Sequence, residues 1–172
     1  MLSSKLALIA LAAAAQVGIL CTMIVVDSLP YQLGETIRLK VIPVDPRDMF
    51  RGDYVVLGYE FSNLHENEVT GLEKSGGYYW DHAGQPVYVL LEKDADDDVW
   101  RPQEISANRP STGTYLRGQI DRLGRVDCGI GAYFVQEGEG RQIEQAIRED
   151  QNAVAEVAVW NGQAKLKRVI ID

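Results

Sequence analysis

The chain has 172 residues, of which 25 are acidic and 17 basic, and its net charge at pH 7 is −8. This length is enough for one domain of ordinary size with its own hydrophobic core. All 25 acidic residues but only 16 of the 17 basic ones follow the first apolar segment, and this acidic balance disfavours binding to nucleic acid or to anionic lipid.

An apolar segment opens the chain. Residues 6–26, LALIALAAAAQVGILCTMIVV, contain no charged residue, and Gln16 is their only strongly polar side chain. At about 1.5 Å of rise per residue, a helix of this length crosses a hydrocarbon core of about 30 Å. The run continues well past Ala12–Ala15, where a cleavage site could stand, so we expect residues 1–30 to be an uncleaved signal-anchor.

The charges that flank this segment predict its orientation. Lys5 precedes it, and Asp27 and Glu35 are the first charges after it. The positive-inside rule then places the N-terminus in the cytoplasm. We therefore expect a single-pass protein of the inner (cytoplasmic) membrane whose second domain, residues 31–172, is extracytoplasmic (periplasmic).

After Pro30 the apolar residues recur with a period of two, which predicts half-buried strands. One helix is predicted after the anchor, in 137–150, because Ile143, Ala146 and Ile147 share one face. The fold class is therefore mainly β, a small antiparallel β-barrel or sandwich with one short helix behind a transmembrane helix. The predicted strands are 35–44, 53–61, 86–93, 99–105, 114–123, 124–135, and the pair 153–160 and 163–172, which Asn161-Gly162 joins as a hairpin.

Cysteine and histidine, which often act in catalysis or bind metals, are sparse in this chain. Cys21 lies in the apolar segment and Cys128 is alone in the domain, where a small buried residue is the favoured interpretation. The acidic run 94–98 lacks the glycine and the distal glutamate of a calcium loop, which favours a solvated hairpin tip. His65 and His82 lie in a polar excursion without metal-ligand spacing, so we expect no metal and no cofactor.

Charged residues crowd the turn before the second predicted strand. VDPRDMFRGDYVVLGYE, residues 44–60, contains Asp45, Arg47, Asp48, Arg51 and Asp53. The aspartates can accept hydrogen bonds from turn amides or from the arginines. We favour a hydrogen-bonded structural turn, and a partner or ligand surface and a catalytic cluster remain alternatives.

Within this stretch, Gly52-Asp53-Tyr54-Val55-Val56-Leu57-Gly58-Tyr59 resembles, letter for letter, the pattern that names the GDYXXLXY family of bacterial proteins. The residues just before the motif, Asp45-Pro46-Arg47-Asp48 and Arg51, are also similar to that family. So is a second block later in the chain, although Gln136 occupies a position where the family would have proline. The residues of the second block are Tyr133, Phe134, Glu137, Gly138, Gly140, Arg141 and Glu144.

The resemblance implies a membrane-anchored domain without an established activity that accompanies multi-spanning membrane proteins. We therefore expect it to act by protein–protein contact with such a partner, and not as an enzyme. A hydrolase that uses the Asp/Arg turn and a small-ligand-binding module are the alternatives. We also expect the two family blocks to meet in space, with Arg141 in salt-bridge reach of Asp45, Asp48 or Asp53.

Overall fold

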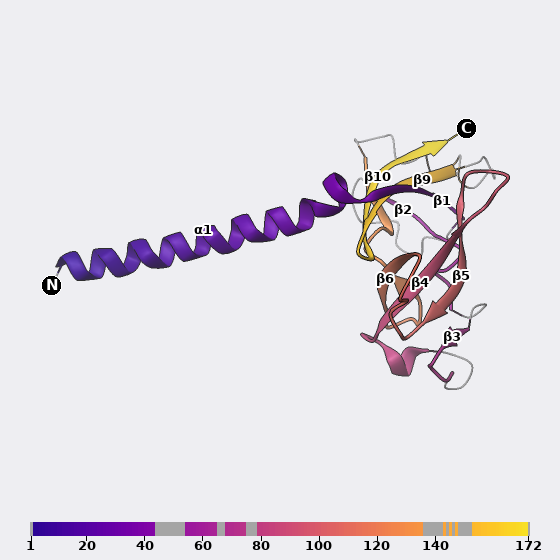
Figure 1. Cartoon of the computed structure of the whole chain (residues 1–172), viewed down its shortest axis with the longest axis horizontal. Helices are drawn as coiled ribbons and strands as arrows, with labels where there is room; N and C mark the ends of the chain where they lie inside the picture. The colour runs from indigo at the N-terminus through magenta and orange to yellow at the C-terminus, as the bar shows by residue number, and fades with distance from the viewer. Residues whose placement is uncertain are drawn as a thin grey trace.

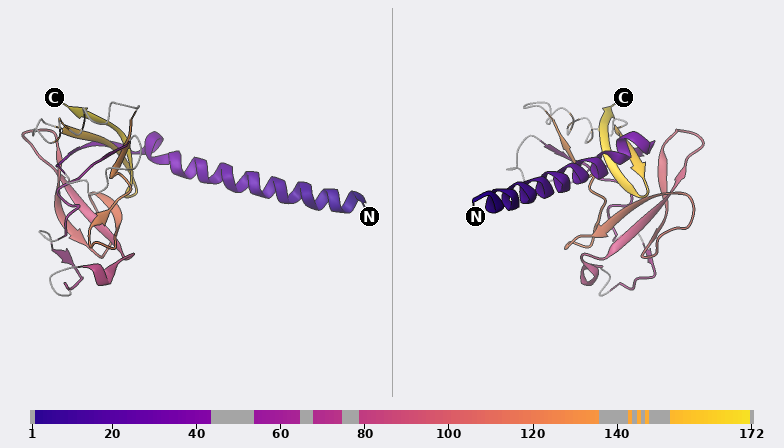
Figure 2. Two further views of the ribbon diagram at one scale, coloured as in Figure 1. Left: turned by 180° about the vertical axis from the view of Figure 1, so that it is seen from behind. Right: turned by 60° about the vertical axis from the view of Figure 1, so that its left-hand side comes forward.

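The computed structural model consists of one long helix and a β-rich domain (Figure 1). It describes residues 2–43, 54–64, 68–74, 79–135, 143, 145, 147 and 153–171. Helix α1, Leu2–Leu33, projects from the domain as a straight rod (Figures 1 and 2). Its segment Lys5–Leu33 is long and apolar enough to cross a membrane, so one N-terminal helix could anchor the protein by a single pass.

The domain is a curled sheet that forms half of a barrel (Figure 2). Its strands lie in the order β10-β9-β1-β5-β4-β6-β7, with β3 added beside β5. A short 3-10 helix, η1 (Trp80–His82), precedes β4. The strand bounds are β1 Glu35–Lys40, β3 Val69–Thr70, β4 Pro86–Lys93, β5 Trp100–Ser106, β6 Thr114–Ile120, β7 Val126–Asp127, β9 Ala153–Trp160 and β10 Gln163–Ile171.

Two further strands, β2 (Tyr54–Val56) and β8 (Ala132–Phe134), pair with each other in a separate antiparallel ribbon. Most neighbours in the main sheet are also antiparallel, which confirms the expected fold class. The exceptions among the described strands are β1 and β3, both of which run parallel to β5. Parallel neighbours need long connections, and about sixty residues separate β1 from β5 in the chain.

The curl of the sheet brings the β9–β10 turn onto β6, although three strands lie between β9 and β6 in the sheet order. The backbone amide of Arg117 donates a hydrogen bond of 2.7 Å to the carbonyl of Gly162. A Cβ atom at Gly162 would lie 2.4 Å from the ring of Tyr115, so only glycine fits at this contact. Asn161 and Gly162 both have positive φ, 53° and 82°, as the predicted Asn-Gly hairpin requires.

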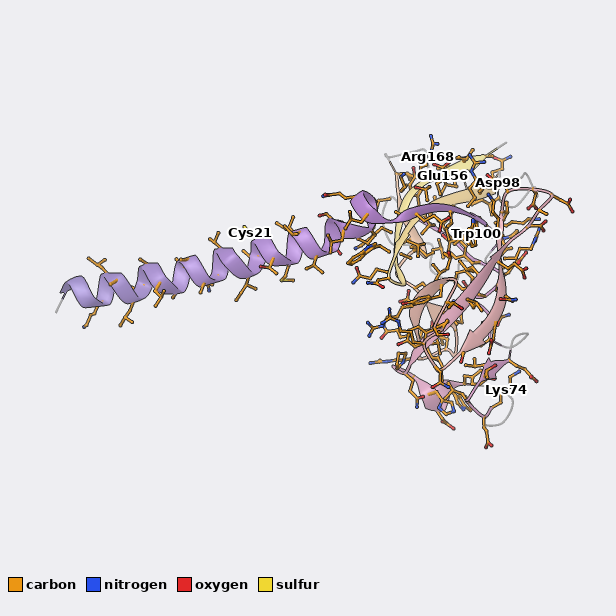
Figure 3. All side chains as sticks on the ribbon, in the orientation of Figure 1. Cys21, Lys74, Asp98, Trp100, Glu156 and Arg168 are labelled. Carbon is orange, nitrogen blue, oxygen red and sulfur yellow. The ribbon has the colours of Figure 1, made fainter. Side chains whose placement is uncertain are left out.

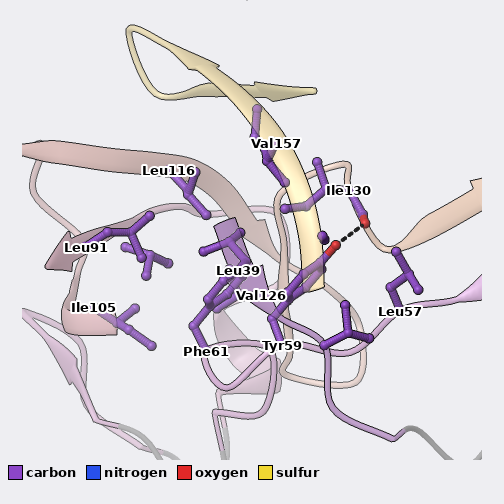
Figure 4. Close-up of a cluster of buried hydrophobic side chains, with 14 of the residues drawn as sticks. Leu39, Leu57, Tyr59, Phe61, Leu91, Ile105, Leu116, Val126, Ile130 and Val157 are labelled. Atoms are coloured by element: carbon purple, nitrogen blue, oxygen red, sulfur yellow. Dashed lines mark hydrogen bonds between the residues drawn. The ribbon is translucent and has the colours of Figure 1, made fainter. Parts of the chain in front are cut away.

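The concave side of the sheet encloses the hydrophobic core (Figure 4). Residues 143, 145 and 147 are helical, and Ile147 is buried in this core while Ile143 packs against it. These two side chains therefore face the sheet, as their spacing predicts. The core side chains drawn and labelled in Figure 4 include Leu39, Leu91, Ile105, Leu116, Val126, Ile130 and Val157.

The end of α1 is packed onto the β9–β10 hairpin. The Tyr31 hydroxyl donates a hydrogen bond of 3.2 Å to the Leu166 carbonyl, and Lys165 forms an ion pair with Asp27. At Gly34 a Cβ atom would lie 2.3 Å from the Pro30 carbonyl oxygen and 2.8 Å from that of Val159. The chain thus passes from helix to sheet without a flexible linker.

Two predicted strands are shorter than expected. The predicted strand 53–61 is a regular strand, β2, only as far as Val56. Leu57 still bonds to Gly131 in the same register, but Gly58 pairs with Ile42, and a turn closed by the Ser62 amide and the Tyr59 carbonyl follows. The predicted strand 124–135 is split between β7 and β8, which belong to different sheets. Gly129, with φ of 73°, lies in the bend that separates them.

Candidate functional site

The family motif contributes alternate side chains to the hydrophobic core of the domain. Val55, Leu57 and Tyr59 are buried, whereas Val56 between them is 39% exposed. This alternation is what a strand with one face on the core produces. Beyond β2 the Leu57 amide continues the β2–β8 register by donating to the Gly131 carbonyl at 2.9 Å. The motif then changes partner, since the Ile42 amide donates to the Gly58 carbonyl at 2.9 Å.

The second block lies directly beside the first. In the β2–β8 ribbon, Tyr54 is opposite Phe134 and Val55 is opposite Tyr133. This pairing confirms the prediction that the two blocks meet in space. The Tyr133 side chain is half-buried against the core, but Phe134 is 79% exposed.

Tyr59, the last residue of the motif, ties the first block to the segment that precedes β8 (Figure 4). Its hydroxyl donates a buried hydrogen bond of 2.9 Å to the Ile130 carbonyl. Its ring stacks on Phe61, with the centroids 5.3 Å apart and the planes parallel. Burial raises the pKa of Tyr59 well above its usual value, so the hydroxyl stays protonated and its role is structural.

A cavity of about 530 Å³ lies against this segment. Its lining includes apolar residues of the motif and the ion pair between Asp121 and Arg125. Its volume falls within the range of sites for small molecules, about 300–1,000 Å³. The lining residues are Ile42, Pro43, Val56, Leu57, Gly58, Tyr59, Phe61, Ser62, Asn63, Asp121, Leu123, Arg125, Val126, Asp127, Cys128, Ile130 and Gly131.

Cys128 at this cavity has the character of a structural residue. Its sulfur packs against Gly118, where a Cβ atom would lie 2.8 Å from Sγ. Burial raises the pKa of the Cys128 thiol to about 12, and the Asp127 carboxylate adds to the rise. Because the thiolate is the nucleophilic form, this thiol is unreactive at neutral pH.

The charged turn that precedes β2 lies outside the described residues. Its members Asp45, Arg47, Asp48, Arg51, Gly52 and Asp53 lie outside the described residues, as do Glu137, Gly138, Gly140, Arg141 and Glu144. The predicted salt bridge of Arg141 with this turn therefore stays a prediction. Among the residues that the structure does describe, no group of three or more His, Cys, Asp or Glu side chains is placed to hold a metal ion.

The acidic run at the β4–β5 turn is a solvent-exposed hairpin tip, as the sequence predicts, and ion pairs connect it to its neighbours. Arg101 donates hydrogen bonds of 2.8 Å to both Asp94 and Asp97, and a third of 3.1 Å to Glu60, which directly follows the motif. Asp98 pairs with Lys93 at 2.5 Å and with Arg38 at 3.5 Å. These contacts hold the motif end and the hairpin tip together.

Sequence reasoning also missed a buried carboxylate. Glu156 on β9 is 7% exposed and lies between Arg168, at 2.6 Å, and Arg38, at 3.5 Å (Figure 3). The hydrogen bond from Arg168 is the main cause that lowers the pKa of Glu156. The signal was present, since Glu156 interrupts the apolar run AVAEVAVW. A buried charge requires such partners.

These features define a class of protein, a curled-sheet domain with a motif strand held against its core, preceded by one long apolar helix that could span a membrane. The chain matches the family model described as "GDYXXLXY protein" over residues 16–169, so it belongs to that family. No reaction is established for the family. No curated protein and no solved structure matches the chain.

Proposed function

We propose that this protein is an accessory subunit that acts by protein–protein contact with a multi-spanning membrane protein. In this proposal α1 is an uncleaved signal-anchor in the inner membrane and the β-rich domain lies outside the cytoplasm. Two surfaces support the contact, one on the domain and one on the helix.

The exposed apolar side of the β2–β8 ribbon carries the proposal. Phe134 is 79% exposed, more than any other large hydrophobic side chain of the described residues, and Val56 on the neighbouring strand is 39% exposed. Val56 belongs to the first block of the family pattern and Phe134 to the second. Exposed apolar side chains that gather on one element are typical of surfaces that a partner covers.

The helix offers a second contact inside the bilayer. Gln16 is the only strongly polar side chain between Leu6 and Val26, and it makes no hydrogen bond within the described part of the chain. An amide in hydrocarbon is costly unless another polar group satisfies it, and polar side chains in membrane helices commonly bond to a neighbouring helix. A multi-spanning partner supplies such helices.

The packed joint between α1 and the domain links the two surfaces. Tyr31, the Asp27–Lys165 ion pair and the tight approach at Gly34 fix the direction in which the helix leaves the sheet. A partner that binds Gln16 in the membrane is therefore presented with the ribbon at a fixed position outside it. Two weak contacts held in this way reinforce each other, because the second binding event becomes intramolecular.

The test is native purification of the full chain from its own membrane in mild detergent. We expect stoichiometric co-elution of one multi-spanning membrane protein, reduced in Phe134→Ser and in Gln16→Leu. Leu123→Ser is the matched control, because Leu123 is also highly exposed, at 67%, but lies in the β6–β7 turn. Elution of the wild-type chain alone, or equal losses in the control, would contradict the proposal.

The orientation has its own test. A reporter fused after Asp172 that works only outside the cytoplasm should be active, and the mature chain should retain residues 1–26. Activity of a cytoplasmic reporter at the same position would reverse the topology. A mature chain that begins near Gln16 would show that the anchor is removed.

The cavity beside the motif favours a second candidate function, a small-ligand-binding module. Its walls are mainly apolar, with Ser62, Asn63 and the Asp121–Arg125 pair as polar groups. Native mass spectrometry of the purified chain should then show a bound small molecule. Gly131→Leu, which adds bulk at the lining, should remove that mass while the sheet stays folded, and a wild-type chain without any adduct would count against this candidate.

A further inference from the structure

Basic residues gather where α1 joins the domain, although the domain as a whole is acidic. Lys165 on β10 pairs with Asp27 near the end of the apolar run. Lys167, two residues further on, donates a hydrogen bond of 3.2 Å to the hydroxyl of Thr36 in β1, three residues after α1 ends. Both lysines are thus placed beside the base of the anchor.

Two arginines extend this basic surface, Arg109 in the β5–β6 connection and Arg117 on β6. Arg109 donates a hydrogen bond of 3.2 Å to the side chain of Asn161 in the β9–β10 turn. The backbone of Arg117 bonds to Gly162 in the same turn, and the Arg117 side chain is exposed. Neither arginine has a carboxylate partner among the described residues. Their charges are therefore available to another molecule.

The β9–β10 turn lies at the level where the apolar segment ends. Gln163, directly after the turn, lines one groove of about 660 Å³ together with α1 residues from Thr22 to Tyr31. Figure 1 shows β6 and the β9–β10 hairpin on the side of the domain from which α1 leaves. With α1 in a membrane, this side faces the headgroups.

Aromatic rings accompany the cations, as they do in the interfacial belts of membrane proteins. The guanidinium of Arg109 lies 5.5 Å from the centre of the Tyr115 ring, and Tyr88 meets Tyr115 edge to face at 6.0 Å. The Tyr115 hydroxyl is buried, so this residue supports Arg109 through its ring and does not itself reach the headgroups.

We propose that this anchor-side surface, Arg109, Arg117, Lys165 and Lys167, contacts the anionic phospholipid headgroups of the bilayer that holds α1. We choose anionic lipid as the ligand because its negative charge is complementary to the positive charge of this surface. The acidic β4–β5 turn, marked by Asp98 in Figure 3, lies on the side of the domain away from α1. An anionic surface attracts the basic side and repels the acidic side, so it orients the domain. The overall negative charge of the domain conceals this asymmetry.

The experiment places the full chain in lipid nanodiscs of phosphatidylcholine alone or of equal parts phosphatidylcholine and phosphatidylglycerol. A trace of lipid with a gadolinium chelate on its headgroup reports distance through relaxation of backbone amides. We expect the relaxation enhancement at Arg117 and Gly162 to rise about two-fold or more with phosphatidylglycerol, and to fall again as salt screens the charges. The amide of Asp96, in the distant β4–β5 turn, should not change.

The variant Arg109→Gln/Arg117→Gln should lose this rise. Lys40→Gln/Lys74→Gln is the control of equal charge, because both lysines are exposed. Lys40 is at the end of β1 that is further from α1 along the chain, and Lys74 lies far from α1 in Figure 3. Amide spectra of both variants verify the fold. Equal enhancement in the two lipid mixtures, or equal loss in the control, would overturn the proposal. So would a close approach that occurs only when a partner membrane protein shares the disc, which would assign the surface to protein.

Discussion

Removal of one hydroxyl, in Tyr59→Phe, tests whether the motif tyrosine is a structural residue. The change keeps the ring that stacks on Phe61 but leaves the Ile130 carbonyl without its 2.9 Å hydrogen bond. Tyr59 is only 2% exposed, so water does not readily replace the lost donor. A buried acceptor left unpaired costs about 1–3 kcal/mol of unfolding free energy.

The assay is urea unfolding of the full chain in detergent, followed by circular dichroism of the sheet. With a slope of about 1–3 kcal/mol per molar urea, the midpoint should fall by several tenths of a molar or more. Tyr115→Phe is the matched control, because the Tyr115 hydroxyl has no partner among the described residues and its removal should cost nothing. Wild-type stability in Tyr59→Phe, or an equal loss in Tyr115→Phe, would refute the structural role.

The same residue gives a pH dependence. Burial raises the pKa of Tyr59 in the folded state above the unfolded value of about 10. The folded chain then holds this proton where the unfolded chain loses it, so the stabilisation is complete below about pH 10 and is lost as pH rises beyond it. Tyr59→Phe should reduce this alkaline loss, and an unchanged alkaline profile would contradict the argument.

Three further predictions concern other parts of the domain. Cys128 should react with iodoacetamide at pH 7 far more slowly in the folded chain than in urea, and comparable rates would contradict the raised pKa of this partly buried thiol. Glu156→Gln should destabilise the domain by about 1–3 kcal/mol, because Arg168 loses its charged partner, and urea unfolding measures this loss. Since the pKa of Glu156 is lowered on folding, its contribution should also disappear in wild type as pH falls below about 4. Gly34→Ala should distort the joint between helix and sheet, because its Cβ would lie 2.3 Å from the Pro30 carbonyl oxygen, and faster proteolysis after Leu33 would report this.

Much of the fold could be predicted because its signals are local. The charge-free apolar segment indicated the long N-terminal helix, and period-two patterns gave β4, Pro86–Lys93, with both bounds correct. Asn161-Gly162 predicted the β9–β10 hairpin because both residues adopt positive φ. In each case a few neighbouring residues determine the structure.

The remainder depends on contacts between distant segments. The place of β1 between β9 and β5, and the contact of the β9–β10 turn with β6, come from the curl of the whole sheet. The same holds for the short β2, because Gly58 pairs with Ile42 from a distant part of the chain. For the site, the sequence predicted that the two blocks meet, but the cavity and the partners of Glu156 could emerge only in three dimensions.

Site-specific cross-linking in cells tests the proposed protein contact most directly. A photo-reactive phenylalanine analogue at Phe134 should give one adduct of defined mass, with a multi-spanning membrane protein. The same analogue at Leu123, which is also highly exposed but lies in the β6–β7 turn, should not give that adduct. The adduct from Phe134 should also weaken in Gln16→Leu, because the helix contact holds the ribbon against the partner. An absence of protein adducts at Phe134, or the same adduct from Leu123, would contradict the account.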